Sequence, residues 1–194
     1  MQIIREQTAQ IEQTETLIQG YMTESYKNAA DAIDAIPGIG QVSAQQIVAE
    51  IGVDMSRFPT AAHLCNWAGI CPGNNESAGK RKSGRTNYAN KTLKSTLVQC
   101  AQSAKKNKSS FFSAQYQRLV VRRGKNRATV AVAHSMLIAI YHVLKGAAFC
   151  DLGADYYTQF NREKKINSHI KQLSKLGVSI SDDALRSIIA ESAA

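Results

Sequence analysis

Residues 35–52, "AIPGIGQVSAQQIVAEIG", carry the clearest local structural signal in the chain. An apolar helix is expected to end near Ile36, because a proline and two glycines follow it. A second helix is expected to begin after Gly40 and to end at Gly52, a residue type common at helix C-termini. Its predicted inward side chains are Val42, Ile47, Val48 and Ile51. The segment therefore predicts two helices joined by a tight turn.

This turn resembles the helix-hairpin-helix motif of DNA-binding proteins. Glycines let a backbone approach a ligand closely and adopt positive φ. The free N–H groups that begin the second helix carry partial positive charge, so they suit a phosphate. Such contacts recognise the nucleic-acid backbone and not its bases. The predicted DNA-binding residues of the turn are Pro37, Gly38, Ile39 and Gly40. A purely structural helical hairpin is the alternative.

The charge distribution extends the same expectation. The chain has 194 residues and a formal net charge of +9, and no Asp or Glu occurs between Ala78 and Cys150. Helix surfaces in water usually mix both signs of charge. We therefore favour phosphate contact over a merely soluble basic surface. The basic residues of this stretch are Lys80, Arg81, Lys82, Arg85, Lys91, Lys94, Lys105, Lys106, Lys108, Arg118, Arg122, Arg123, Lys125, Arg127 and Lys145.

A basic loop is predicted at residues 71–85, "CPGNNESAGKRKSGR". Its Gly, Asn and Ser content is too high for a helix interior. Residue chemistry alone leaves two interpretations of Ser77, a nucleophile or an ordinary loop serine. The predicted phosphate contacts in and after this loop are Lys80, Arg81, Lys82, Arg85, Lys91 and Lys94.

The remaining segments predict a mainly α fold, because no run of alternating strand residues appears. Ile4, Ile11 and Ile18 recur every seven residues, which indicates an amphipathic, coiled-coil-like helix over residues 1–28. Packing of this helix on its own domain is the alternative. Trp67 is expected to anchor the core. Further helices are expected at about 60–68, 91–104, 111–123, 128–144, 161–176 and 181–190.

The pattern predicts that the chain is divided into four parts: an amphipathic helix at 1–28, a helix-hairpin-helix at 29–52, a larger helical domain at 53–150 and a helical extension at 151–194. The apolar residues 128–144 predict a core helix and not a membrane span, since the run is short and contains two histidines. The N-terminal residues do not have the pattern of a signal peptide.

The four cysteines, Cys65, Cys71, Cys100 and Cys150, lack the spacing of a zinc site. Reduced core thiols in a cytoplasmic protein are the expectation. No metal ligand set and no cofactor site are predicted in this chain.

The order of the motifs resembles transposases of the insertion-sequence-110 family. It is carried by "IPGIG" at 36–40, "FPTAAHLCNWAGICPGNNESAGKRKSGR" at 58–85, "NKTLK" at 90–94 and "DLGADYY" at 151–157. The resemblance covers about residues 1–180 and matches the C-terminal part of these enzymes. It implies an N-terminal RuvC-like domain elsewhere, with four carboxylates that bind Mg²⁺, joined through a coiled coil to a transposase domain that supplies a serine nucleophile.

The resemblance assigns the serine role to Ser77, within the loop Pro72–Gly79. Family members have a serine followed by glycine, whereas Ala78 separates Ser77 from Gly79 here. Ser83, which directly precedes Gly84, is the second candidate. Lys94 stands where family members have arginine, which weakens bidentate phosphate binding.

The resemblance also implies DNA as substrate, a guide RNA from the element, and a homo-oligomer, dimer or tetramer, away from membranes. This chain has no predicted carboxylate tetrad, so we expect it to be inactive in cleavage by itself. Two alternatives remain: a non-catalytic helix-hairpin-helix module that binds nucleic acid, and an assembly piece that dimerises through residues 1–28.

Overall fold

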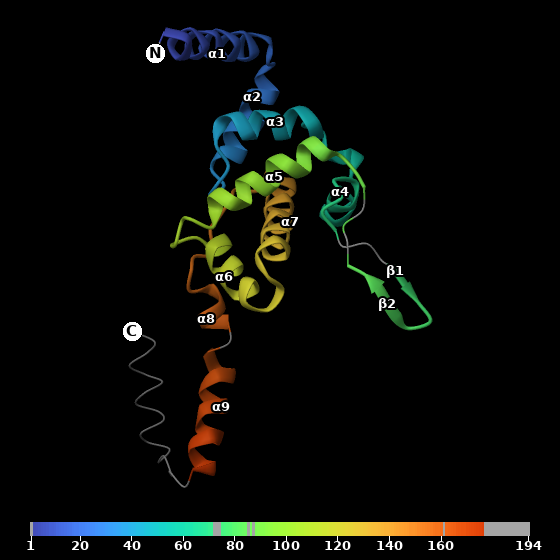
Figure 1. Ribbon diagram of the computed structural model, residues 1–194, viewed down its shortest axis with the longest axis vertical. Helices are drawn as coiled ribbons and strands as arrows, with labels where there is room; N and C mark the ends of the chain where they lie inside the picture. Colours follow the sequence, from blue (N-terminus) through green and yellow to red (C-terminus); the bar gives the residue numbers. More distant parts are fainter. Residues whose placement is uncertain (1, 72–74, 85, 87, 161, 177–194) are drawn as a thin grey trace. The chain divides into compact units, whose positions relative to one another are not determined.

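The computed structural model describes residues 2–71, 75–84, 86, 88–160 and 162–176. The chain divides into two compact units, Met1–Ala154 and Asp155–Ala194 (Figure 1). Its elements are α1 Gln2–Tyr21, α2 Glu24–Asp34, α3 Gln41–Ile51, the 3-10 helix η1 Met55–Arg57, α4 Ala61–Trp67, β1 Asn75–Ser77, β2 Lys80–Ser83, α5 Lys91–Ala104, α6 Phe111–Arg123, α7 Lys125–Leu144, α8 Tyr156–Phe160 and α9 Arg162–Lys175. The predicted mainly α class is confirmed.

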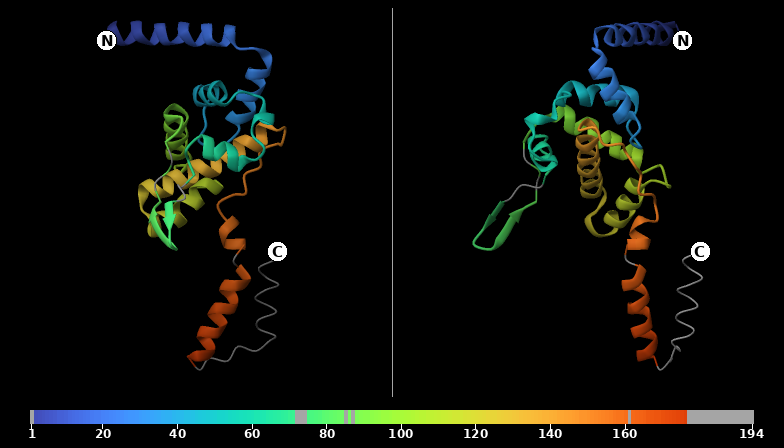
Figure 2. Two further views of the ribbon diagram at one scale, coloured as in Figure 1. Left: turned by 90° about the vertical axis from the view of Figure 1, so that its right-hand side faces the viewer. Right: turned by 180° about the vertical axis from the view of Figure 1, so that it is seen from behind.

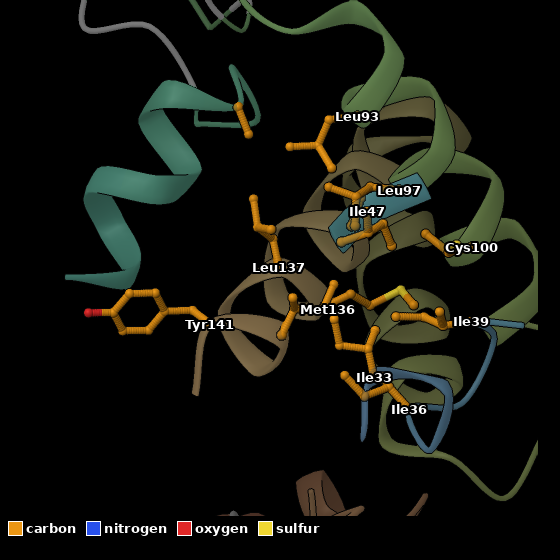
Figure 3. Close-up of a cluster of buried hydrophobic side chains, with 14 of the residues drawn as sticks. Ile33, Ile36, Ile39, Ile47, Leu93, Leu97, Cys100, Met136, Leu137 and Tyr141 are labelled. Atoms are coloured by element: carbon orange, nitrogen blue, oxygen red, sulfur yellow. The ribbon is translucent and has the colours of Figure 1, made fainter. Parts of the chain in front are cut away.

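Helix α7 lies at the centre of the first unit. It packs against α2, α4, α5 and α6, as the two views of Figure 2 show. Figure 3 shows the side chains of Leu97, Cys100, Met136 and Leu137 meeting in one core. The phenol of Tyr141 donates a hydrogen bond of 3.0 Å to the Phe58 carbonyl, which ties α7 to the segment before α4. Among the described helices α7 is long and apolar enough to cross a membrane, but half of its most apolar window is buried in the protein. It is the predicted core helix.

The predicted two-helix segment at 35–52 is confirmed. Helix α3 ends at Ile51 and is followed by Gly52 with a φ of 79°. The buried residues of α3 are Ala44, Ile47, Val48 and Ile51, spaced as one helical stripe. Val42 was expected among them and is instead 54% exposed. It shares the opposite stripe with the exposed Gln46 and Ala49, because residues four and seven positions apart lie on the same side of a helix.

The N-terminal helix differs from the expectation. Helix α1 ends at Tyr21, and α2 begins at Glu24 after the N-cap residue Thr23, so residues 1–28 form no single helix. No residue of α1 is buried. Its exposed large apolar side chains are Ile3, Ile4, Ile11, Leu17, Ile18 and Tyr21. A coiled coil formed by this stripe stays a prediction.

Trp67 was wrongly expected to anchor the core. Its side chain is 43% exposed, and its ring lies 5.5 Å from that of Phe58. Trp67 ends a helix of only seven residues whose buried side chains are Leu64 and Cys65. The short helix therefore turns its last residue away from the interior.

The second unit contains α8 and α9. Helix α9 confirms the helix expected at 161–176, apart from its ends. The rings of Tyr156 and Tyr157 meet edge to face in α8, with centroids 5.3 Å apart. The helix predicted at 181–190 lies outside the described residues.

Candidate nucleic-acid interface

The turn between α2 and α3 holds the predicted helix-hairpin-helix residues in different environments. Gly40 is exposed, whereas Pro37 and Gly38 are half-buried. The Ile39 side chain is buried, and its backbone N–H donates to the Ile36 carbonyl at 3.0 Å. Gly40 is the N-cap residue of α3 and supplies no side-chain cap. The first N–H groups of α3 therefore keep the partial positive charge that suits an anion.

Gly38 places this turn against the end of α5. A β-carbon added to Gly38 would lie 2.5 Å from the backbone nitrogen of Ala104. The next residues of the chain include Lys105, Lys106 and Lys108, and the last two are exposed. We call the turn Pro37–Gly40 together with these three lysines the turn surface.

The lysines of the turn surface were not among the predicted site residues. They belong to the acid-free stretch, but more than sixty positions separate them from Gly38 in the sequence. The packing of Gly38 on Ala104 brings the turn to the helix end that precedes these lysines, and no local signal in the sequence records that contact. Lys105 is half-buried: its ammonium donates to the Gln102 side chain at 2.6 Å and lies 5.2 Å from the centre of the Tyr116 ring.

The start of α5 is tied to other elements through Asn90. Its side-chain oxygen accepts a hydrogen bond of 3.0 Å from the Leu93 N–H, which caps the helix. Its amide nitrogen donates to the carboxylate of Glu50 in α3. In the same region Lys94 donates to the hydroxyl of Thr86, which follows the basic hairpin. The predicted site residue Lys91 is exposed, and Lys94 is half-buried.

These positions lie at opposite ends of α5. Lys91 begins the helix, and Ala104, which contacts Gly38, ends it. Thirteen steps of an α-helix span about 20 Å. The predicted phosphate contacts therefore do not form one patch: the turn surface and the start of α5 are separate loci of positive charge.

The predicted basic loop contains two short antiparallel strands, which were not expected. The register pairs Asn75 with Ser83 and Ser77 with Lys80. Ala78 and Gly79 form the two-residue turn, with φ values of 51° and 72°. Such a turn commonly has glycine or asparagine at both positions, and alanine seldom adopts positive φ, so the hairpin signal was weak.

The two candidate serines lie at opposite ends of this hairpin. Ser77 ends β1 and directly precedes the turn, whereas Ser83 ends β2 at the base. Lys80, Arg81 and Lys82 are in β2, so three of the predicted cations are part of the hairpin itself. Pro72 and the predicted contact Arg85 lie outside the described residues.

Among the candidate carboxylates of the described residues, Asp151 has a structural role. Asp151 accepts hydrogen bonds from the backbone N–H groups of Phe111, at 2.9 Å, and Gly153, at 3.0 Å. Asp31 and Asp34 are exposed on α2. Among the described residues, no three His, Cys, Asp or Glu side chains are grouped so that they could hold a metal ion. This part of the chain offers no set of ligands for the Mg²⁺ that the family resemblance implies.

The cysteines are free but do not all lie in the core. Cys65 and Cys100 are buried, as expected, whereas Cys150 is exposed because α7 ends before it. Burial raises the pKa of the Cys65 thiol to about 12, and the nearby Cys71 adds to this shift. Burial also raises the pKa of Cys100. Neither thiol has the lowered pKa of a reactive cysteine.

Residues 30–117 match the model of the "Transposase IS116/IS110/IS902 family". The match begins in α2, ends in α6 and includes the turn, the hairpin and α5. The resemblance to the insertion-sequence-110 family is thereby confirmed.

A curated relative supports the same assignment. The transposase for insertion sequence element IS1111A of Coxiella burnetii (strain RSA 493 / Nine Mile phase I) is 30% identical over 116 residues. The aligned region is 58% of this chain and 32% of the relative. The chain therefore spans about a third of the length of the curated relative that it matches.

Proposed function

We propose that this chain is a DNA-binding, serine-bearing part of a transposase that exchanges DNA strands. The observation that carries the proposal is the family match over residues 30–117, which includes the glycine turn and the basic hairpin. Two features of the described elements support the proposal: exposed positive charge, which suits phosphates, and a serine beside a turn.

The proposed chemistry is transesterification at phosphorus. The Ser77 oxygen attacks the phosphorus of a DNA phosphodiester while a base takes the hydroxyl proton. The bond between phosphorus and a deoxyribose oxygen breaks, and that oxygen takes up a proton and departs as a hydroxyl. A phosphoserine bond replaces the phosphodiester, so its energy is kept and rejoining needs no ATP. The cations of β2 and the start of α5 stabilise negative charge on the phosphate. The family resemblance assigns the Mg²⁺ that would activate the reaction to a RuvC-like domain.

The geometry of the hairpin favours Ser77 over Ser83. A residue beside a two-residue turn can approach a phosphate with little obstruction from its own chain, whereas a residue at the base of the hairpin adjoins the rest of the domain. Ser77 is next to Ala78 and Gly79, and Ser83 is paired with Asn75. Lys80, the cross-strand partner of Ser77, brings a positive charge to the same end.

DNA binding is tested on the chain itself. Neutralisation of about six phosphates reduces duplex affinity roughly a thousandfold between about 50 and 200 mM salt. We expect fluorescence anisotropy to show this dependence, with little preference between DNA sequences, because the proposed contacts are to the backbone. Affinity that does not change with salt would contradict the proposal.

The serine role is tested in a protein that joins this chain to the RuvC-like domain of a family member. A suicide DNA substrate should form a covalent adduct with this protein. Ser77→Ala should abolish the adduct and leave DNA affinity unchanged, whereas Ser83→Ala is the matched control and should retain it. If Ser83→Ala alone removes the adduct, the role belongs to Ser83; if both variants retain it, neither serine is the nucleophile.

A non-catalytic nucleic-acid-binding module is the second candidate function. It is favoured by the described residues, which include no carboxylate cluster for a phosphoryl-transfer site. Salt-sensitive binding without an adduct in the joined protein would support it.

Two partners are proposed alongside DNA. The exposed apolar stripe of α1 supports self-association into a dimer or tetramer, because uncovered stripes of this kind usually pack against another helix. Ile11→Asp should then shift the sedimentation coefficient towards that of a monomer.

A guide RNA is also proposed, on the family resemblance and the basic surface, and a binding assay with element-derived RNA tests it.

A further inference from the structure

The junction of α6 and α7 gathers basic side chains that the proposed reaction does not use. We call this group the α6–α7 corner; it comprises Arg122, Arg123, Lys125 and Arg127. All four residues are exposed. The corner follows the region that matches the family model, which ends at residue 117.

A single glycine creates the corner. Gly124 ends α6, donating its N–H to the Val120 carbonyl at 3.0 Å, and also begins α7, accepting from the Ala128 N–H at 3.1 Å. Its φ of 76° allows the reversal between the two helices. The last turn of α6 and the first turn of α7 therefore present their cations within six residues of chain.

Part of this charge has no structural explanation. Arg122 and Arg123 lie at the C-terminus of α6, where the helix dipole favours cations. Lys125 and Arg127 lie at the N-terminus of α7, where the dipole disfavours them, and the first turn contains no acidic residue. A fold without an anionic partner would gain stability from acidic residues at these positions.

Among the described residues, the four side chains have no bonding partner that would account for their positive charge. In the part of the chain that the structure describes, none of them forms a hydrogen bond or an ion pair with another residue. The neighbouring Val121 is also exposed, at 86%. Because no Asp or Glu occurs between residues 78 and 150, neither helix supplies a counter-charge.

The corner is distinct from the turn surface. Near its start, α6 is tied to the turn surface through the Ser113 hydroxyl, which donates to the Lys105 carbonyl at 3.0 Å. Arg123 lies ten residues further along the helix, a distance of about 15 Å. The helix thus separates two basic surfaces at its two ends.

We propose that the α6–α7 corner binds the phosphate backbone of a nucleic-acid duplex, as a contact additional to the turn surface. Three of its four cations are arginines, whose planar guanidinium groups bind phosphate oxygens in pairs. The first N–H groups of α7 have no side-chain cap, so they add hydrogen-bond donors that carry partial positive charge. The choice of nucleic acid as partner rests on the proposed function; the site itself rests on the corner's geometry and charge.

The test compares two variants that lose the same charge. The corner variant is Arg122→Gln/Arg123→Gln/Arg127→Gln, and the matched control is Arg5→Gln/Arg57→Gln/Lys171→Gln, which changes three exposed cations elsewhere. Affinities for a DNA duplex and an RNA duplex are measured over about 50 to 200 mM salt. The slope of log affinity against log salt should decrease in magnitude by about 2 to 3 for DNA in the corner variant only.

The thermal midpoint of the corner variant should stay close to that of the unmodified protein, because relief of like-charge repulsion offsets the lost interaction of Arg122 and Arg123 with the α6 dipole. If the slope of log affinity against log salt decreases with just one of the two duplexes, that duplex, DNA or RNA, is the source of the phosphates. Suppose that the slope is unchanged in the corner variant but smaller in Lys106→Gln/Lys108→Gln. This result overturns the proposal that the corner binds phosphate and leaves the proposed function standing. An unmodified protein that binds neither duplex overturns both.

Discussion

Gly38 lies directly against the backbone of Ala104, so that a β-carbon at position 38 would come within 2.5 Å of the Ala104 nitrogen. This contact joins the turn before α3 to the end of α5, and its closest atoms are backbone atoms that cannot move aside. Gly38 also has a φ of 91°. The glycine is therefore required for packing as well as for any approach of a ligand.

Gly38→Ala should lower the free energy of unfolding by about 2 to 4 kcal/mol, because it combines positive φ with overpacking. Urea denaturation followed by circular dichroism measures this. A variant as stable as the unmodified protein would show that the turn does not pack closely against α5.

Gly40→Ala should separate binding from folding. Gly40 is exposed, has a φ of −112°, and an added β-carbon would meet no atom within 4 Å. We expect stability within about 1 kcal/mol of the unmodified protein and duplex affinity lower by roughly threefold or more, since a methyl group keeps the phosphate from the α3 N–H groups. Anisotropy and denaturation on the same sample check both. Equal affinity would remove this N-terminus from the interface.

Asn90→Ala should destabilise the protein by about 2 kcal/mol, because it removes the cap of α5 and leaves the Glu50 carboxylate without its partner. Asn90→Ser is the control: it retains a capping oxygen and should recover part of the loss. Asn90→Asp retains the cap but faces Glu50 with a second carboxylate. Its stability at neutral pH should lie below that of Asn90→Ser and should improve on acidification, which denaturation at several pH values would show.

Alkaline stability should depend on Cys65. Its pKa is raised from 9.0 to about 12 in the folded protein, so between these values the unfolded chain loses the proton first. Unfolding therefore becomes more favourable as pH rises from 9 towards 12. Cys65→Ala lacks this contribution, and its stability should decline less steeply over that window. Parallel curves for the two proteins would show that the thiol ionises equally in both states.

Local signals predicted the ends of some helices. The expected helix 111–123 is α6 to the residue, because Ser110 caps its start and Gly124 ends it. Thr60 likewise caps α4 with its hydroxyl. These residues act through neighbours in the sequence, so their effect is visible before the fold is known.

The parts that depend on distant contacts were not predicted. The exposure of Trp67 and Val42 follows from how α4 and α3 are rotated in the core, and apolar character alone does not indicate that rotation. The hairpin depends on positive φ at Ala78, a residue type that seldom adopts it. The turn surface depends on the contact between Gly38 and Ala104, which no local pattern records.

The single-residue junction at Gly124 has a consequence for changes in chain length. There is no linker to absorb an insertion, because Gly124 belongs to the ends of both helices. One residue added within the first turn of α7 would rotate the rest of that helix by about 100°, turning Val132, Met136 and Ile140 away from the interior. The corner should therefore accept many amino-acid exchanges, whereas insertions and deletions there should be selected against in homologous proteins.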